Sequence, residues 1–297
     1  FLLCDAAAMR STRLRVGGPG PLPRTQVILR ARAQGKPSRS RSNVLIAPGF
    51  FNSSEQYLDM REALLSRGHP QVEIIQLKSW EWLLPTILGT SFKFYVDKMD
   101  KLAKKMVQKN KTQSSSSSSR EEEEDLKLSL VAHSAGGWLA RIWLGETVYD
   151  GVRYNGKAFA DRLLTLGTPH LSLEDYPFGR VAEKRKGEGP MTDESKGSSL
   201  QFSNEFCSAS ALEEEVDIIC CCGNLLNGRD GGLVAKSSYR STCGKEEVDG
   251  DGICPLESAQ LPGCKPLVVL DKVAHSPGQN KWYGDEEVVA LWDELLV

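Results

Sequence analysis

The sequence lacks a long uninterrupted apolar run, although 40% of its 297 residues are apolar. A membrane-spanning helix needs about 18 consecutive apolar residues, and the nearest apolar cluster, residues 80–88, is interrupted by Glu81 and Pro85. We therefore expect no transmembrane segment, and at most peripheral contact with a membrane. The apolar content suffices for the core of one large domain.

Two kinds of binding motif are also missing. None of the eight cysteines has the C-x-x-C spacing of a zinc site, and no glycine-rich loop carries a phosphate-binding lysine. We therefore expect neither a metal nor a cofactor. Cys220–Cys222 follow Ile218 and Ile219, which favours small core residues over a redox or ligand role. A disulfide between this cluster and Cys243 is the alternative.

Acidic residues are scarce at the start of the chain. Residues 1–42 contain nine lysine and arginine residues and one acid, Asp5, although the whole chain has a net charge of −2. A leader rich in arginine and poor in acids is typical of an organelle transit peptide. We expect import into an organelle, either the chloroplast or the mitochondrion. A basic arm that binds nucleic acid or anionic lipid is the alternative, disfavoured because this segment has almost no aromatic residues.

Residues 43–297 are predicted to form one domain in which strands alternate with helices. We expect strands at 43–47, 72–77, 128–131, 162–166, 216–221 and 267–270. Amphipathic helices are expected after Ser53, across 92–106, after the strand at 128–131 and near the C-terminus. This alternation predicts the α/β class, with a doubly wound, mostly parallel sheet.

Two segments depart from the alternation. Residues 111–125 contain a serine run followed by four glutamates, a composition that cannot form a core, so we expect a solvated insertion. Residues 171–215 are rich in charge, glycine and serine. They are predicted to be either a lid or a surface excursion.

The pentapeptide at 132–136, Ala-His-Ser-Ala-Gly, places Ser134 between a predicted strand and a predicted helix. This arrangement predicts a nucleophile elbow, a sharp turn that exposes the serine hydroxyl and requires very small residues two positions before and after it. Ala132 and Gly136 are small, although Ala132 stands where the motif usually has glycine.

Histidine is rare, and a serine nucleophile needs a base. Of the four histidines, His69 is expected to face solvent, His133 to point away from the Ser134 hydroxyl, and His170 to be structural. His275, in the loop after the last strand, is the best candidate for the base. Asp251 is preferred as its acidic partner over two alternatives, Asp249 and Asp271.

The tetrahedral intermediate of acyl transfer needs two hydrogen-bond donors for its oxyanion. We expect the backbone N–H groups of Ala135, directly after the serine, and of Phe50, in the Pro-Gly-Phe-Phe loop after the first strand. Phe51 is the alternative to Phe50. The two phenyl rings are expected either to flank an apolar acyl group or simply to pack.

The segments 44–50, 130–141, 164–170, 250–255 and 274–292 resemble the lipase and esterase branch of the α/β-hydrolase superfamily. More narrowly, they resemble plant and algal plastid-type hydrolases described as GPI-inositol-deacylase-like. The resemblance implies an α/β-hydrolase fold, and it implies working roles for Phe50, Ser134, Asp251 and His275. It also favours the chloroplast over the mitochondrion as the destination. The chain departs from the family in Ala132, in Pro48 where many lipases have histidine, and in its lack of the membrane spans of a true GPI deacylase.

The sequence therefore predicts a serine esterase or lipase with the catalytic residues Ser134, Asp251 and His275 and an ester or lipid substrate. An acyltransferase that uses the same residues is the enzymatic alternative. A binding module that keeps the fold without catalysis is the other alternative. A cluster formed by Trp80, Trp82, Leu83 and Leu84 is expected to serve acyl or interfacial contact, or else core packing.

Overall fold

The computed structural model describes residues 41–113, 127–173, 180–181, 197–279 and 281–297. Most of the predicted leader and nearly all of the predicted serine-glutamate insertion lie outside these residues. Among the described residues, no helix combines the length and the apolar character needed to cross a bilayer.

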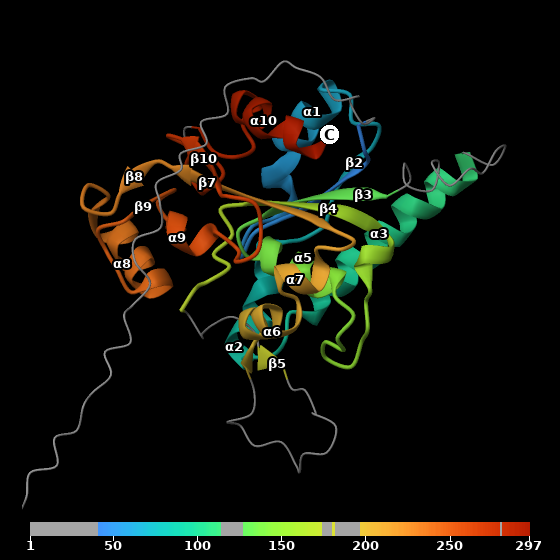
Figure 1. The fold of residues 1–297 in the computed structure, drawn as a ribbon, viewed down its shortest axis with the longest axis horizontal. Helices are drawn as coiled ribbons and strands as arrows, with labels where there is room; N and C mark the ends of the chain where they lie inside the picture. The colour runs from blue at the N-terminus through green and yellow to red at the C-terminus, as the bar shows by residue number, and fades with distance from the viewer. Residues whose placement is uncertain (1–40, 114–126, 174–179, 182–196, 280) are drawn as a thin grey trace, which may run out of the picture.

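A six-stranded parallel sheet forms the centre of the molecule (Figure 1). Its strands are β1 (Val44–Ala47), β2 (Val72–Ile74), β3 (Leu128–His133), β4 (Ala160–Leu166), β7 (Asp217–Asn224) and β10 (Val268–Asp271). The strand order is β10-β7-β4-β3-β1-β2. β3, beside the middle of the sheet, is buried along its whole length, as its apolar composition predicts.

Helices cover both faces of the sheet (Figure 1). One face carries α1 (Leu58–Ser66) and α10 (Glu286–Trp292), and the other carries α3 (Lys93–Gln113), α5 (Ala135–Leu144) and α6 (Ser199–Phe206). The α/β class and the doubly wound parallel sheet predicted from the sequence are therefore confirmed. The carboxyl ends of the strands meet at one edge, where such sheets place their ligands.

Short elements complete the fold. The helices are α2 (Leu83–Leu88), α7 (Ala209–Leu212), α8 (Gly232–Cys243) and α9 (Leu256–Ala259), with 3-10 turns at Ser54–Tyr57, Ser79–Trp82, Gly156–Ala158 and Asp293–Leu296. Two small antiparallel pairs are β5 (Arg180–Val181) with β6 (Gly197–Ser198), and β8 (Leu226–Asn227) with β9 (Asp249–Gly250).

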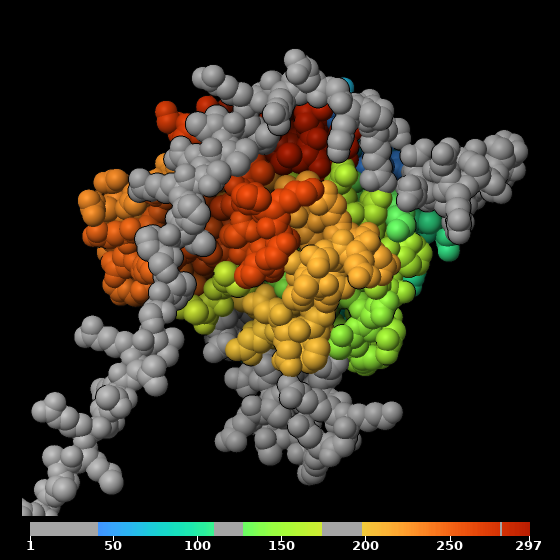
Figure 2. All heavy atoms as spheres, viewed as in Figure 1, coloured from blue at the N-terminus to red at the C-terminus, as the bar shows by residue number. Residues whose placement is uncertain are grey.

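The second half of the predicted excursion is an ordered part of the body. Leu200, Phe202 and Leu212, from α6 and α7, are buried in the same core cluster as α3 and α5. Figure 2 shows this segment, in gold, between the green residues near 150 and the orange-red residues near 260. The many charged residues of this segment obscured its apolar positions in the sequence. These few apolar residues are enough to anchor two short helices on the core.

The prediction that His69 faces solvent is wrong, because the side chain is fully buried. Its Nδ1 lies 2.8 Å from the carbonyl oxygen of Ser42, and its Nε2 lies 2.8 Å from Asp293 Oδ1. Arg41 and Arg67 also contact the Asp293 carboxylate. This cluster joins the start of the domain to its last turn.

Candidate active site

Ser134 occupies a strained turn between β3 and α5, with φ of 52° and ψ of −129°. Few residues other than glycine adopt such angles, and doing so costs about 1–3 kcal/mol. Two hydrogen bonds hold the turn: the N–H of Ser134 donates to the Leu166 carbonyl at 2.9 Å, and the side-chain hydroxyl of Thr168 donates to the Ser134 carbonyl at 2.8 Å. Ser134 is partly exposed, whereas its neighbours His133 and Ala135 are buried.

The small residues around the turn have a steric reason. A Cβ on Gly136 would lie 2.5 Å from the carbonyl oxygen of Ala47 and 2.9 Å from that of Pro48. The first turn of α5 therefore packs directly on the end of β1. The methyl group of Ala132, which replaces the usual glycine of the motif, is buried in the core.

The structure brings Ser134, His275 and Asp251 together. His275 Nε2 lies 3.0 Å from Ser134 Oγ, and His275 Nδ1 lies 2.7 Å from Asp251 Oδ2. A carboxylate only accepts hydrogen bonds, so Nδ1 carries the hydrogen and the Nε2 lone pair faces the serine hydroxyl. This is the arrangement in which imidazole can take the serine proton.

The Asp251 carboxylate is fully buried, and both of its oxygens accept hydrogen bonds. Oδ1 accepts from the N–H groups of Ile253 and Cys254, at 3.0 and 2.6 Å. Oδ2 accepts from His275 and from the Tyr283 hydroxyl, which lies 2.6 Å away. These donors fix the orientation of the buried carboxylate toward His275.

The two other acids considered from the sequence lie elsewhere. Asp249 accepts a hydrogen bond from Asn227, and Asp271 is exposed at the end of β10. His170 is buried and contacts Arg141 and Thr165, which agrees with the expected structural role. None of these three side chains has a contact with the hydroxyl of Ser134.

The ring of His133 lies against that of His275, with 4.7 Å between the ring centroids. Tyr57 accepts a hydrogen bond from the N–H of Gly49 and therefore donates to His133 Nδ1, at 2.7 Å. Burial, and after it the charge of His275, lowers the pKa of His133 well below its ordinary value. His133 is thus a neutral neighbour that does not compete with His275 for a proton.

The Pro-Gly-Phe loop touches the elbow. A Cβ on Gly49 would lie 2.8 Å from both Ser134 Cβ and His133 Nδ1, so this glycine provides room. The positive φ in the loop belongs to Phe51, at 57°. The N–H groups of Phe50 and Ala135 therefore stand on the two backbone segments that flank Ser134.

The apolar cluster predicted around Trp80 divides into two parts. Trp82 is fully buried, and its ring packs edge-on against Phe50, with the centroids 5.1 Å apart. Trp80, Leu83 and Leu84 are exposed, as are Ile87 and Leu88 of the same segment. This exposed apolar surface, on the 3-10 turn at 79–82 and on α2, is named the α2 face.

Comparison with solved structures identifies the architecture. The mature form of the Bacillus licheniformis lipase BlEst2 superposes with a TM-score of 0.54 at 16% identity, over 88% of this chain and 94% of that one. The form of the same lipase with its propeptide gives a TM-score of 0.52 at 16% identity, over 88% of this chain and 51% of that one.

The chain has the α/β-hydrolase fold. A pyrethroid hydrolase from Sphingobium faniae JZ-2 is more distant, with a TM-score of 0.43 at 13% identity, over 85% of this chain and 96% of that one. No protein-family model matches the chain, and neither does any curated protein sequence. The narrower resemblance to GPI-inositol-deacylase-like hydrolases therefore stays a prediction.

Two residues that support the geometry of Ser134, His275 and Asp251 were not predicted from the sequence. Tyr283 is buried, accepts a hydrogen bond from the N–H of Gly223 at 2.7 Å and donates to Asp251. A Cβ on Gly167 would lie 2.5 Å from Asp251 Oδ2, so only glycine fits there. No local pattern marks these residues, because their partners are distant in the chain.

Among the described residues, no group of histidine, cysteine and acidic side chains is arranged to hold a metal ion. The hydrogen bonds of His275 and Asp251 described above are made to protein groups. The site therefore consists of the Ser134 hydroxyl, the His275 imidazole and the Asp251 carboxylate, each in contact with the next.

Proposed function

We propose that this protein is a serine hydrolase that cleaves carboxylic esters through an acyl-enzyme on Ser134. The observation that carries the proposal is the chain of contacts from Ser134 Oγ through His275 to Asp251, at 3.0 and 2.7 Å, on a strained elbow. Folds of this kind bind substrates at the carboxyl ends of their strands, and the position of Ser134 directly after β3 supports the proposal.

In the first half of the reaction, Ser134 Oγ attacks the ester carbonyl carbon while its proton moves to His275 Nε2. The carbonyl oxygen becomes an oxyanion, and the N–H groups of Ala135 and Phe50 are proposed to donate to it. A donor of this kind contributes about 2.7–4 kcal/mol to the transition state. The intermediate then collapses, and the alcohol leaves with the proton that His275 returns.

In the second half, water takes the place of the alcohol. His275 accepts a proton from the water as its oxygen attacks the acyl carbon, and it then returns that proton to Ser134 Oγ as the acid leaves. Asp251 orients the imidazole through Nδ1 and stabilises its protonated form. Hydrogen bonds from Ile253, Cys254 and Tyr283 keep the carboxylate aimed at Nδ1 in both halves.

An apolar, lipid-like acyl group is the proposed substrate class. The rings of Phe50 and Phe51 lie 4.4 Å apart by their centroids, next to the loop that touches Ser134. Phe51 is 40% exposed and the α2 face adds further apolar surface, so contact with a lipid aggregate or membrane surface belongs to the proposal. The solved protein of similar fold is itself described as a lipase.

Import into a chloroplast, or failing that a mitochondrion, is proposed from residues 1–42. The arginine-rich, acid-poor composition of this segment supports the proposal. Residues 1–42 fused to a fluorescent protein are expected to direct it into the organelle. A cytosolic distribution of the fusion would contradict the proposal.

The test is the hydrolysis of p-nitrophenyl esters of increasing acyl length by the protein and by its Ser134→Ala variant. We expect the variant to lose about 10⁴-fold or more in kcat, as when a triad serine is removed. Ser241→Ala, on the exposed side of α8, is the matched control and is expected to keep full activity. Equal rates for the protein and Ser134→Ala would exclude the proposed chemistry and favour a binding module.

Product analysis in the presence of acceptor alcohols completes the test. Free acid as the main product supports hydrolysis. A new ester as the main product would instead assign acyl transfer to the same three residues.

A further inference from the structure

Two fully buried tyrosines hydrogen-bond to the same peptide unit, the one that joins Pro48 to Gly49 directly after β1. The hydroxyl of Tyr95, on α3, donates to the carbonyl oxygen of Pro48 at 2.7 Å. The hydroxyl of Tyr57, the last residue of the 3-10 turn at 54–57, accepts from the N–H of Gly49 at 2.8 Å. Because the C=O and the N–H of one peptide unit lie in one plane, the two hydroxyls together fix the orientation of that plane.

Gly49 needs such a restraint. A side chain does not fit at this position, since a Cβ would lie 2.8 Å from Ser134 Cβ. Glycine, however, has more accessible backbone conformations than any other residue, so its own backbone does not fix the shape of the loop. The hydrogen bonds of the two tyrosines restrict the rotation that the missing side chain permits.

The next peptide unit carries the proposed oxyanion donor. This unit consists of the Gly49 carbonyl and the Phe50 N–H, and its carbonyl oxygen accepts from the N–H of Asn52 at 3.1 Å. It is joined to the peptide unit before it through the Cα of Gly49. A rotation of the first plane would therefore redirect the second, so the direction of the Phe50 N–H depends on both tyrosine hydroxyls.

The two tyrosines also contact the elbow. The hydrogen of the Tyr57 hydroxyl is donated to Nδ1 of His133, the residue before Ser134, at 2.7 Å. A Cβ on Gly136, two residues after Ser134, would lie 3.0 Å from the Tyr95 hydroxyl, so this glycine leaves room for it. Burial raises the pKa of both tyrosines well above the ordinary value, so both hydroxyls keep their hydrogens.

We propose that Tyr57 and Tyr95 are positioning residues that clamp the peptide plane between Pro48 and Gly49 and thereby aim the Phe50 N–H at the oxyanion of the tetrahedral intermediate. The two side chains are named the tyrosine clamp. Its role rests on the proposed function, because the oxyanion forms only when Ser134 attacks a carbonyl carbon. The clamp acts through the loop backbone, so its effect falls on the transition state and leaves substrate binding unchanged.

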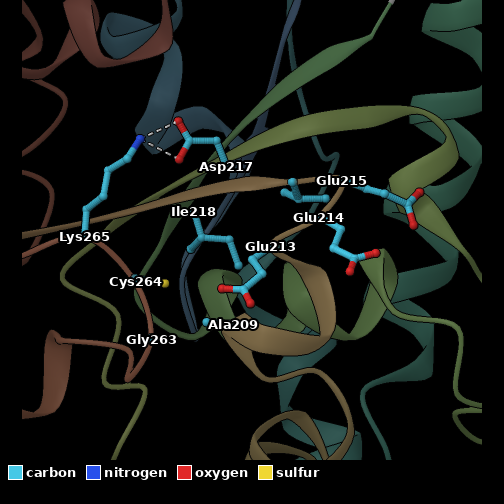
Figure 3. Close-up of a pocket in the computed structure, with 10 residues that line it drawn as sticks. Ala209, Glu213, Glu214, Glu215, Asp217, Ile218, Gly263, Cys264 and Lys265 are labelled. Atoms are coloured by element: carbon cyan, nitrogen blue, oxygen red, sulfur yellow. Dashed lines mark hydrogen bonds and ion pairs between the residues drawn. The ribbon is translucent and has the colours of Figure 1, made fainter.

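The cavity at the start of β7, of about 380 Å³, is separate from the clamp. The strands of the sheet are parallel, so this cavity and the end of β1 lie at opposite edges. Figure 3 shows the ion pair between Asp217 and Lys265 beside the cavity, and the sulfur of Cys264 at its wall. The described cysteines are free, so the disulfide considered between residues 220–222 and Cys243 is not formed.

The experiment removes one hydroxyl at a time, in Tyr57→Phe and Tyr95→Phe, and measures the hydrolysis of p-nitrophenyl esters. We expect kcat to fall about 10–100-fold at unchanged KM, since the loss of a complete oxyanion donor costs about 10²–10³-fold. The double variant should lose less than the product of the two single losses, because both hydroxyls act on one peptide unit. Inhibition by a trifluoromethyl ketone, which forms a tetrahedral adduct with serine, should weaken by the same factor as kcat/KM.

Tyr149→Phe is the matched control. Tyr149 is also fully buried, and its hydroxyl also accepts from a backbone N–H, that of Phe92, at 3.0 Å. We expect this variant to lose stability as the clamp variants do and to keep its kcat. Glu214→Gln, at the wall of the cavity, should keep both. Rates like those of the unsubstituted protein in both clamp variants, or an equal loss of kcat in Tyr149→Phe, would overturn the proposal.

Amide hydrogen exchange, measured by NMR, reads the clamp without catalysis. We expect the Gly49 amide to exchange about 10-fold faster in Tyr57→Phe, the equivalent of one lost hydrogen bond, and at an unchanged rate in Tyr149→Phe. Unchanged exchange in Tyr57→Phe would overturn the proposal. An unsubstituted protein without esterase activity would overturn the proposed function and with it the role of the clamp, whereas equal activity of protein and clamp variants would overturn the clamp alone.

Discussion

The hydroxyl of Tyr283 lies 2.6 Å from Asp251 Oδ2, the oxygen that also faces His275. The same hydroxyl accepts from the backbone N–H of Gly223 and therefore has its hydrogen directed at the carboxylate. Burial, and after it the charge of Asp251, raises the pKa of Tyr283 well above its ordinary value, so the hydroxyl remains a donor. Tyr283 is thus a positioning residue that acts on the proposed triad through Asp251.

Tyr283→Phe removes this donor. We expect a loss of stability of about 1.5–3 kcal/mol, typical of a hydrogen bond to a charged group, and a fall in kcat with little change in KM. Denaturant unfolding and ester kinetics measure the two effects. Tyr154→Phe is the matched control, because Tyr154 also donates to a carboxylate, Asp97, at 2.7 Å but lies away from Ser134. Equal kinetic effects of the two variants would contradict the positioning role.

Gly136→Ala tests the packing of the elbow. Within a helix, alanine is ordinarily more stable than glycine by about 0.5–1 kcal/mol. Here the added Cβ would lie 2.5 Å from the Ala47 carbonyl oxygen, so we expect destabilisation of about 1–3 kcal/mol. The thermal unfolding temperature of the variant should fall. An unchanged or raised temperature would mean that α5 does not pack against β1 as described.

The contacts of Asp293 with His69, Arg41 and Arg67 predict that the stability of the protein depends on pH. Burial acts to raise the pKa of Asp293, but hydrogen bonds from His69, Arg41 and Arg67 lower it below its ordinary value. An acid with a lowered folded-state pKa stabilises the protein above its unfolded-state pKa, and this stabilisation is lost as the pH falls through the folded-state pKa. We therefore expect Asp293→Asn to be destabilised near neutral pH by about 3–5 kcal/mol.

Urea unfolding at a series of pH values measures this effect. The difference in unfolding free energy between the protein and Asp293→Asn should shrink as the medium becomes acidic. Asp271→Asn, at an exposed position, is the control and should show no such trend. A difference that stays constant down to acidic pH would contradict the charge-based account.

The α2 face predicts a preference for aggregated substrates. Ile87 is 70% exposed, and Ile87→Glu places a charge on this apolar surface. We expect slower hydrolysis of emulsified long-chain esters and unchanged hydrolysis of soluble short-chain esters. Leu233→Glu, at an 87% exposed leucine on α8, is the matched control. Equal losses on both substrate types, or the same loss in the control, would contradict interfacial contact through the α2 face.

The sequence predicts those features of the fold that depend on local patterns. Short apolar runs between the amphipathic helical segments predict all six strands of the sheet to within a few residues. The small residues around Ser134 predict the turn. The chain order then places Asp251 and His275 at strand ends on the same edge. Strands, helices and tight turns are predictable because each depends on residues that are neighbours in the sequence.

What the sequence did not predict depends on partners far apart in the chain. His69 is buried because Asp293, 224 residues later, lies beside it. Trp80 and Trp82 look alike in the sequence, but only Trp82 meets the aromatic side chains of the core. Tyr283 likewise acquires its role only when β7 and the loop after β10 are assembled.

Labelling with a fluorophosphonate probe tests the central claim most directly, because the probe forms a covalent bond only with an activated serine. We expect one label for each folded chain, found on Ser134 by peptide mass spectrometry, and no label on Ser134→Ala or on heat-unfolded protein. Absence of label on the folded protein, or an equal amount of label on Ser134→Ala, would contradict the account.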